Sequence, residues 1–392
     1  MMKQALAVTT LNLKTLPSRF WSSLVIVLGV AGVVGVVLSV LAMVTGLTAA
    51  MQHAGHADRA IILRGGSDTE ISSTLTRDDT VTILDAPGIR HDATGRAVGS
   101  AEAVLILSRP MRNGGTDANV TLRGVGPQPL ALRPEIHLVE GRFLEPGLHE
   151  LVVGRGAQRQ FAGLVLGSHV NIRDTDWTIV GVFASDGDAH ESEILADADT
   201  VMAVYRRTLF QSVTVQLDSP AAFSTLQDAL TTNPSLSVEV QRETDYLAKL
   251  SANLTKVMNL IAGVVGSIMA IGAVFGALNT MYSAVSARTL EIATLRAIGF
   301  GGLPIVASVL AEALILSLLG GSVGAALAWL FFNGHGVNAL GGNFTQLVFR
   351  LTVTPALMIQ GIGWALVIGL IGGLFPASRA ARLPITTALR TL

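Results

Sequence analysis

Cysteine is missing altogether from this sequence, and charged residues are scarce. The absence of cysteine excludes disulfide bonds and thiolate metal sites, and it is compatible with exposure to an oxidising compartment. Asp, Glu, Lys and Arg make up 14% of the 392 residues, against about 25% in soluble globular proteins. Because 50% of the residues are hydrophobic and the mean hydropathy is +0.54, this deficit of charge indicates a membrane protein. The net charge of −1 gives no global sign of nucleic-acid binding.

The motifs of common enzyme classes are missing as well. No G-x-x-x-x-G-K-[ST] is present, so the sequence has no P-loop for ATP, and it has neither G-x-S-x-G nor H-E-x-x-H. The best cluster of candidate metal ligands is SDGDAHESE, with Asp186, Asp188, His190, Glu191 and Glu193. It lacks the spacing of a calcium loop, and a solvated turn explains it better than a metal site. We therefore predict no catalytic residue, bound metal or cofactor in this chain.

Four apolar segments are long enough to cross a bilayer, which takes roughly 20 residues. They are residues 22–47, 257–285, 304–332 and 355–375, and the third contains a single charge, Glu312. The first is too long for the core of a signal peptide and lacks a clear cleavage site, so we interpret it as a retained anchor. The predicted fold class is a polytopic α-helical membrane protein with four transmembrane helices.

The basic residues predict the orientation of these segments. They precede the first segment, lie between the second and third, and follow the fourth: Lys3, Lys14, Arg19, Arg288, Arg296, Arg379, Arg382 and Arg390. All of these positions fall on one side of a four-span topology, and the positive-inside rule makes that side the cytoplasm. We therefore expect a multi-pass membrane protein with both termini in the cytoplasm.

The sequence outside the spans divides into five regions. Residues 48–256 contain short β-rich runs such as AVLILS, VTLRGV and WTIVGVF, interleaved with helical windows. They predict a mixed α/β extracytoplasmic core domain, with a helical stalk that leads into the second span. The other regions are an amphipathic helix on the cytoplasmic face, a cytoplasmic coupling-helix loop, an extracytoplasmic loop and a cytoplasmic tail, at residues 1–21, 286–303, 333–354 and 376–392.

Small residues and one acid stand out within the spans. G-x-x-x-G pairs begin at Gly272, Gly320 and Gly369, and together they favour a tightly packed bundle or dimer. Glu312 lies inside the third span, where a carboxylate is costly and has to face the bundle or water. It could be a relay or substrate contact, but a structural hydrogen bond to another span or to the inner loop is the better interpretation, because no second charge lies within the spans.

The stretch RTLEIATLRAIGF, residues 288–300, interrupts the apolar sequence between the second and third spans. Arg288, Glu291, Ile292 and Leu295 share one helical face, Arg296 lies beside it, and Gly299 is a natural helix stop. A loop that only carried topology signals would need the charges but not an apolar row at helical spacing. The pattern therefore predicts a helix that docks into a partner's groove, with Ile292 and Leu295 as its buried anchors.

The wider stretch NTMYSAVSARTLEIATLRAIGF resembles the inner-loop signature of MacB/FtsX-type permeases of ABC transporters, the type VII or mechanotransmission group. SVLAEALILSLLGGSVG resembles the third span of that family, including its glutamate, and FPASRAARLPITTALR resembles its closing segment. EGRFLEPGLHELVVG and GSHVNIRDTDWTIVGVF resemble its external core domain, so the likeness covers nearly the whole chain. The matching positions are Asn279, Met281, Arg288, Glu291, Ile292, Arg296, Ala297, Gly299, Glu312, Gly320, Gly321, Pro376, Ala377, Leu383, Pro384, Ala388, Leu389 and Arg390. The sequence departs from the family at ATL in EIATLRAIG, where relatives commonly have a glycine.

The resemblance implies a role for each part of the chain. Residues 288–299 would be the coupling helix seated on an ABC ATPase, and the missing P-loop implies that Mg-ATP is bound by a separate ATPase subunit. The resemblance further implies a place in the bacterial inner membrane and a second permease copy, in a homodimer or heterodimer. A periplasmic adaptor and an outer-membrane channel are further expected partners, for a drug, peptide, glycolipid or lipoprotein.

Two other functions fit parts of the same pattern. An FtsX-like permease would use the same motion to activate an external cell-wall hydrolase and would transport nothing. The large β-rich external domain favours an exporter over that signalling device. A membrane-anchored metalloenzyme would depend on residues 185–193 alone.

Reporter fusions test the predicted topology. A reporter fused after Arg155 should report the extracytoplasmic side, and one fused after Arg390 should report the cytoplasm, because the basic residues retain both termini inside. The same compartment for both fusions would contradict the four-span arrangement.

Overall fold

The computed structural model describes residues 9–10, 20–340 and 345–382. The amphipathic helix predicted for residues 1–21 and the end of the predicted tail lie almost wholly outside this part. The chain divides into two compact units. The membrane unit comprises residues 1–45, 257–335 and 351–392, and the core domain comprises residues 46–256 and 336–350.

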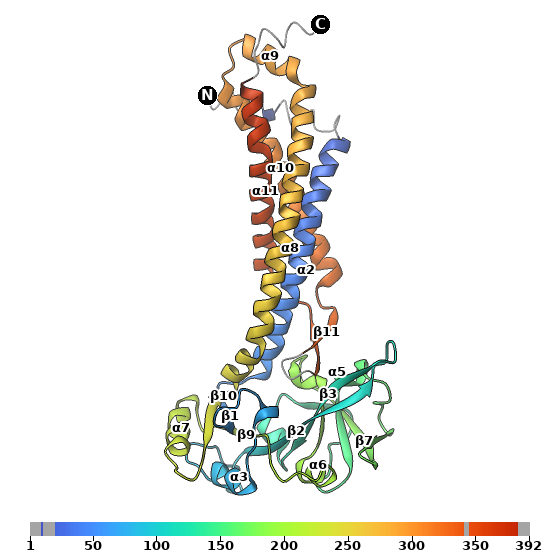
Figure 1. Ribbon diagram of the computed structural model, residues 1–392, viewed down its shortest axis with the longest axis vertical. Helices are drawn as coiled ribbons and strands as arrows, with labels where there is room; N and C mark the ends of the chain where they lie inside the picture. Colours follow the sequence, from blue (N-terminus) through green and yellow to red (C-terminus); the bar gives the residue numbers. More distant parts are fainter. Residues whose placement is uncertain (1–8, 11–19, 341–344, 383–392) are drawn as a thin grey trace. The chain divides into compact units, whose positions relative to one another are not determined.

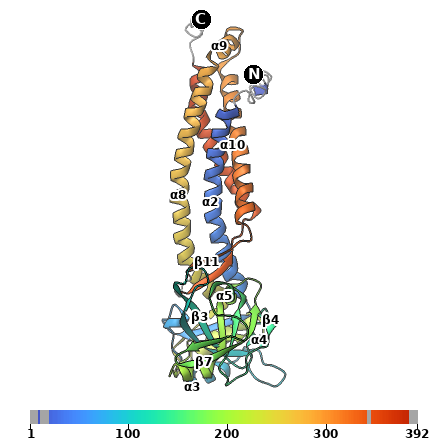
Figure 2. The same cartoon turned by 90° about the vertical axis from the view of Figure 1, so that its right-hand side faces the viewer.

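Four long helices contain the predicted spans, which confirms the predicted fold class. They are α2 (Phe20–Ala54), α8 (Glu243–Ala287), α10 (Gly302–Phe332) and α11 (Pro355–Ala381), and all four are long and apolar enough to cross a membrane. In both views they lie side by side (Figures 1 and 2). Helices α2, α8 and α11 extend beyond the predicted spans, because a helix does not have to end where its apolar residues end. In α11, Pro376 lies inside the helix rather than at the start of a tail.

Glycines allow three of these helices to approach closely. A Cβ atom at Gly320 would lie 2.8 Å from the Val27 carbonyl oxygen of α2, and one at Gly324 would lie 2.5 Å from that of Ala31. On α11, a Cβ atom at Gly369 would collide with Ser317 of α10. Two of the three G-x-x-x-G motifs thus lie at helix contacts within the chain, whereas Gly272 has open space around it.

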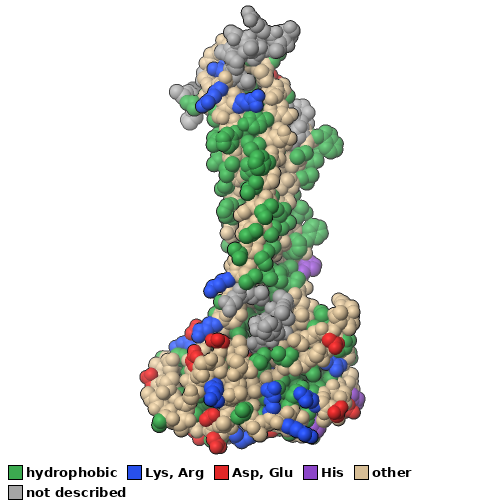
Figure 3. All heavy atoms as spheres, in the orientation of Figure 1, with side chains coloured by type: hydrophobic (Ala, Val, Ile, Leu, Met, Phe, Trp, Pro, Cys, Tyr) green, Lys and Arg blue, Asp and Glu red, His purple; other side chains and the backbone are tan. Residues whose placement is uncertain are grey.

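The outer surface of the four helices is apolar (Figure 3). On helix α8, for example, Leu260, Ile268 and Phe275 each expose about two thirds of their surface. A soluble protein would bury such side chains, whereas lipid tails surround them without cost, so this surface suits a bilayer.

A ten-stranded mixed sheet forms the centre of the core domain. Its strands lie in the order β10-β1-β9-β2-β3-β8-β5-β7-β4, and β6 pairs with β7 outside this path. The pairs β3·β8 and β5·β7 are parallel, and the other pairs are antiparallel. The strands are β1 (Arg59–Arg64), β2 (Gly99–Pro110), β3 (Asp117–Val125), β4 (His137–Gly141), β5 (Glu150–Gly154), β6 (His169–Ile172), β7 (Thr175–Ala184), β8 (Glu193–Asp197), β9 (Ser212–Gln216) and β10 (Val238–Arg242).

Short helices cover the sheet and enclose two main apolar clusters. One contains Ile83 of α3 and Leu226 of α7, and the other contains Trp177 of β7 and Phe161 at the end of α5. The β-rich runs identified in the sequence all lie in strands of this sheet, and VTLRGV of β3 is buried at every position. The helices are α3 (Arg77–Leu84), α4 (Pro129–Leu132), α5 (Arg155–Gln160), α6 (Ala198–Val204), α7 (Phe223–Thr231) and the 3₁₀ turns η2 (Glu70–Ser72), η3 (Ala189–Ser192) and η4 (Pro220–Ala222).

The segment between α10 and α11 is a hairpin rather than a plain loop. Strands β11 (Gly336–Leu340) and β12 (Gln346–Arg350) pair in antiparallel register. The hairpin belongs to the core domain, although the chain enters and leaves it from two membrane helices.

The close contact between α10 and α11 predicts that a larger side chain at Gly369 destabilises the protein. We expect Gly369→Leu to lower the free energy of unfolding by about 1–3 kcal/mol, because the new side chain has to displace Ser317. Gly363→Leu on the same helix is the matched control, since a Cβ atom there meets nothing within 4 Å. Thermal unfolding of the purified variants in detergent measures both, and equal melting temperatures for the two would contradict this packing.

Candidate functional site

A short helix, α9 (Thr289–Ala297), connects α8 to α10. Glu291 lies in its first turn and Arg296 in its last, and each charge suits the helix dipole at that end. Gly299 has a φ of +98°, which glycine adopts without strain, and its N–H donates to the Arg296 carbonyl at 3.1 Å. The segment predicted to be helical over residues 288–300 therefore contains a helix with the expected glycine stop.

Arg288 ties this connection to α10 through Glu312. Its Nη1 lies 3.4 Å from Glu312 Oε2, and its Nε donates to Glu291 Oε2 at 3.1 Å. The side chains of Arg288 and Glu312 are 9% and 8% exposed, whereas that of Glu291 is 60% exposed. The structure thus places Glu312 against the inner loop, in the contact that its sequence position suggested as an alternative to a relay.

The apolar row of α9 turns toward the chain's own helices. Ile292 is 7% exposed and belongs to the same buried cluster as Met281, Val285 and Ile305. Leu295 is half-buried, and both side chains line a cavity of about 20 Å³ together with Arg288 and Glu312. The expectation that Ile292 anchors a partner is therefore wrong. Helical periodicity identified the residues that share a face, but not the direction in which that face points.

The surface that α9 and its ends leave exposed is also apolar. Leu290 is 49% exposed, Ile298 is 69% exposed, and Leu303 at the start of α10 is 71% exposed. Arg296 is half-buried, and Glu291 lies at the edge of this surface. We call Leu290, Ile298 and Leu303 the outer face of the coupling loop.

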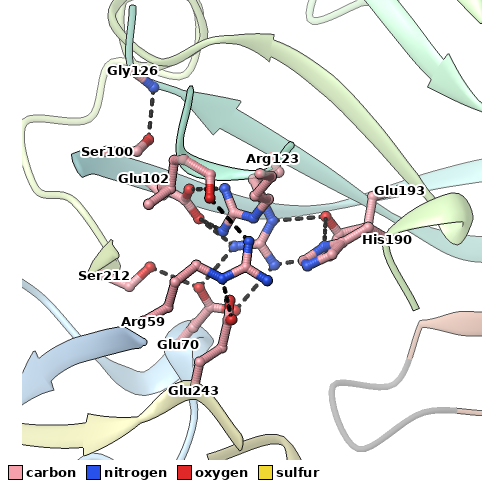
Figure 4. A network of polar contacts seen from close by, with 12 residues as sticks. Arg59, Glu70, Ser100, Glu102, Arg123, Gly126, His190, Glu193, Ser212 and Glu243 are labelled. Carbon is pink, nitrogen blue, oxygen red and sulfur yellow. Dashed lines mark hydrogen bonds and ion pairs between the residues drawn. The ribbon is translucent and has the colours of Figure 1, made fainter. Parts of the chain in front are cut away.

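The core domain contains a buried ionic cluster that the sequence analysis missed (Figure 4). At its centre Arg123 of β3 donates to Glu70, Glu102 and Glu193, at distances of 2.7–3.1 Å. Arg133 also contacts Glu102, at 2.6 Å. The available signal was the charge inside otherwise apolar strand sequences, such as the arginine of VTLRGV. A third arginine, Arg59 of β1, bridges Glu135 and Glu243.

Electrostatics explains why these charges tolerate burial. Burial alone would raise the pKa of Glu102, but the opposite charges of Arg133 and Arg123 outweigh it and hold that pKa below its usual range. The same competition, with Arg123 as the main partner, lowers the pKa of Glu193. Removing one partner from such a cluster would leave an uncompensated buried charge, which costs about 3–5 kcal/mol. The cluster therefore holds η2, β2, β3 and β8 in one arrangement.

The turn at residues 185–193 differs from the solvated turn predicted for it. Asp188 and His190 are buried, and Glu193 belongs to the ionic cluster. Asp188 accepts from the His190 backbone N–H at 2.9 Å, and Glu191 accepts from the backbone N–H groups of Ser185 and Gly187. In the part of the chain that the structure describes, no group of three or more His, Cys, Asp or Glu residues could hold a metal ion.

Two family models match the chain. The MacB-like periplasmic core domain matches residues 23–233, and the FtsX-like permease C-terminal model matches residues 263–385. The first covers α2 and most of the core domain, and the second covers α9, the ion pair at Glu312 and most of α8, α10 and α11.

Individual relatives are more distant. A macrolide export ATP-binding/permease protein MacB of Shewanella oneidensis is 24% identical over 368 residues, which are 84% of this chain and 55% of the relative. A protein of the same description from Bdellovibrio bacteriovorus is 26% identical over 299 residues, 69% of this chain and 44% of the relative. The chain thus spans about half the length of these curated relatives. The solved periplasmic region of MacB from Actinobacillus actinomycetemcomitans has a TM-score of 0.36 at 17% identity, over 50% of this chain and 92% of that structure.

The Arg288–Glu312 pair makes a prediction for stability. We expect Glu312→Leu to lower the free energy of unfolding by about 3–5 kcal/mol, because it removes the buried carboxylate that faces Arg288. Glu312→Gln should cost less, since an amide still accepts a hydrogen bond. Glu291→Leu is the control, because an exposed pair contributes at most about 1 kcal/mol.

A double variant separates the ion pair from general packing. Arg288→Met combined with Glu312→Leu should recover part of the loss, because neither charge is then left buried. Thermal unfolding in detergent measures all four variants. A Glu312→Leu protein as stable as the Glu291→Leu protein would show that the pair does not hold the loop.

Proposed function

Because the chain belongs to the family that joins a MacB-like periplasmic core domain to an FtsX-like permease region, it is an ABC transporter permease, and we propose that α9 receives the ATPase's motion. The protein is a multi-pass membrane protein with an extracytoplasmic domain. ATP hydrolysis takes place in an ABC ATPase unit, for which this sequence contains no P-loop.

The observation that carries this proposal is the way α9 is held. Arg288 and Ile292 attach its inner side to the membrane unit, while Leu290 and Ile298 on the outer face stay exposed beside the bundle's charged end. An exposed apolar patch at a loop between two spans suits a partner protein's groove. Through the ion pair with Glu312, a displacement of α9 is passed directly to α10.

Helix continuity extends this motion to the core domain. Helix α8 runs without interruption from Glu243 to Ala287, and α2 runs from Phe20 to Ala54. Each helix therefore contributes residues to both units of the chain. A rigid helix transmits displacement along its axis, so ATP-driven movement of α9 would reach the sheet without a cargo channel through the bundle.

The proposed complex contains two permease copies, both with cytoplasmic termini, and the ATPase. In a bacterium with two membranes, a periplasmic adaptor and an outer-membrane channel complete an export route. The cargo class would be a drug, peptide, glycolipid or lipoprotein. The match of residues 23–233 to a MacB-like core domain supports export over activation of a cell-wall hydrolase.

Variants of the outer face test the docking. We expect Leu290→Ala with Ile298→Ala to reduce co-purification with the ATPase and the ATPase rate of the reconstituted complex, because truncating a docked anchor costs roughly 2 kcal/mol. The double variant should insert and fold normally, since both side chains are exposed.

The matched control is Val139→Ala with Val165→Ala, two exposed apolar side chains of the core domain. Arg288→Ala should act differently and lower stability, because it breaks the buried pair. Unchanged co-purification and ATPase rate in the Leu290/Ile298 variant would contradict docking through the outer face, and the charges of the loop would then serve only to orient the spans.

A further inference from the structure

His190 is a buried titratable side chain that the proposed function does not use. It lies in η3 of the core domain and is 7% exposed. Its Nδ1 is 3.4 Å from Glu193 Oε2, and its Nε2 has no hydrogen-bond partner among the described residues. A buried nitrogen without a partner is rare in proteins and requires a physical reason.

The reason lies in the charges around it. The arginines of the ionic cluster are outnumbered by its carboxylates, and Asp188 adds one more buried acid. A protonated imidazole supplies positive charge where the cluster lacks it, and its position beside Glu193 is visible in Figure 4. Five acidic groups of the cluster and its surroundings are less than 10% exposed, against three basic groups. The acidic groups are Glu70, Glu102, Asp188, Glu193 and Glu243, and the basic groups are Arg59, Arg123 and Arg133.

The groups that face the imidazole come from several elements. Burial alone would lower the pKa of His190, but the Glu193 hydrogen bond and the charges of Asp188 and Glu193 outweigh burial and the repulsion from Arg133. The net effect raises this pKa above its ordinary value of 6.5. Glu135 also interacts with the ring, so acids dominate its surroundings.

A cavity of about 70 Å³ opens beside the ring and separates it from the β11–β12 hairpin. His190, Glu193, Glu70 and Arg123 form one part of its lining, and Thr345 and Gln346 of the hairpin segment form another. The volume suffices for a few water molecules, which can accept the hydrogen bond that Nε2 otherwise lacks. The charge of His190 therefore acts electrostatically on the hairpin residues that line the same cavity.

The turn that carries His190 also holds the hairpin directly. The Val348 backbone N–H of β12 donates to Ser192 Oγ of η3 at 2.8 Å. Nearby, Thr121 Oγ1 donates to Thr345 Oγ1 at 3.2 Å. On its other side η3 packs closely against α5. A Cβ atom added at Gly156 of α5 would lie only 2.8 Å from the Glu191 carbonyl oxygen of η3, so there is no room between the two elements. A shift of η3 has to move Ser192, and with it the strand that Ser192 holds.

We propose that His190 is a proton-operated latch for the β11–β12 hairpin. With the imidazole protonated, Glu193 and Asp188 hold η3 in place and the hairpin is seated on Ser192. When the proton leaves, the excess of buried carboxylate is uncompensated, η3 loosens and the hairpin detaches. Because the hairpin joins α10 to α11 along the chain, extracytoplasmic pH would regulate the connection between these helices. The latch depends only on contacts within the core domain and is independent of docking to an ATPase.

The sign of the pH effect follows from the direction of the shift. The pKa of His190 is raised in the folded protein, so protonation favours the seated hairpin. The stabilisation is fully present below pH 6.5, the ordinary imidazole value, and it is lost as the pH rises through the raised value. Between these two values, the ratio of seated to released hairpin should fall about tenfold for each pH unit.

Hydrogen exchange of the full chain in detergent, from pH 5.5 to pH 8.5, tests the latch. Protection factors of β12, corrected for the intrinsic exchange rate, should fall as the pH rises through the raised pKa of His190, about tenfold for each pH unit by which that pKa exceeds 6.5. Protection of α7, which contains no histidine, should stay constant and serves as the internal reference. Constant protection of β12 in the wild-type protein would overturn the proposal, whatever the variants do.

Three variants locate the effect. His190→Gln should give low protection of β12 at every pH and no pH dependence. Ser192→Ala should do the same with His190 intact, because it cuts the link to Val348. His169→Gln changes an exposed histidine of β6 and should behave as wild type. A His190→Gln protein that keeps the wild-type pH profile would assign the effect to another group and contradict the latch.

Discussion

Glu312 of α10 and Arg288 beside α9 form an ion pair whose side chains are 8% and 9% exposed. A carboxylate in the middle of an apolar helix is unfavourable unless an opposite charge reaches it. Arg288 can reach it only if the chain turns directly after α8 and lays α9 against the start of α10. This one requirement places Ile292 inside the membrane unit and leaves Leu290 and Ile298 outside.

The same principle organises the core domain on a larger scale. Arg123 pairs with three carboxylates that come from η2, β2 and β8, so segments far apart in the sequence are fixed around one guanidinium. Both units thus use buried ion pairs to hold separate segments together. In the coupling loop the pair links a helix to its neighbour, and in the core domain the cluster extends to the turn that holds the β11–β12 hairpin.

The elements with strong periodicity were predictable from the sequence. Apolar runs located α2, α8, α10 and α11, and short β-rich runs bounded by Gly, Pro and Asp located the main strands, because burial selects apolar and β-branched side chains directly. The orientation of α9 was not predictable, since the direction of a helical face is decided by tertiary partners such as Glu312. The ionic cluster was missed because its partners lie on separate elements, far apart in the sequence. The β11–β12 hairpin was missed because two strands of five residues each leave little pattern in the sequence.

If Arg288 and Glu312 hold α9 to α10, the two helices should move as one body. Pulsed electron–electron distance measurements on Ala297→Cys with Leu319→Cys test it directly, since the chain has no native cysteine to label. The complex with its ATPase should be measured without nucleotide and with trapped ATP. We expect one narrow distance between the two labels, the same in both states. A shifted or broadened distance with ATP would show that α9 moves relative to α10, and would contradict this expectation.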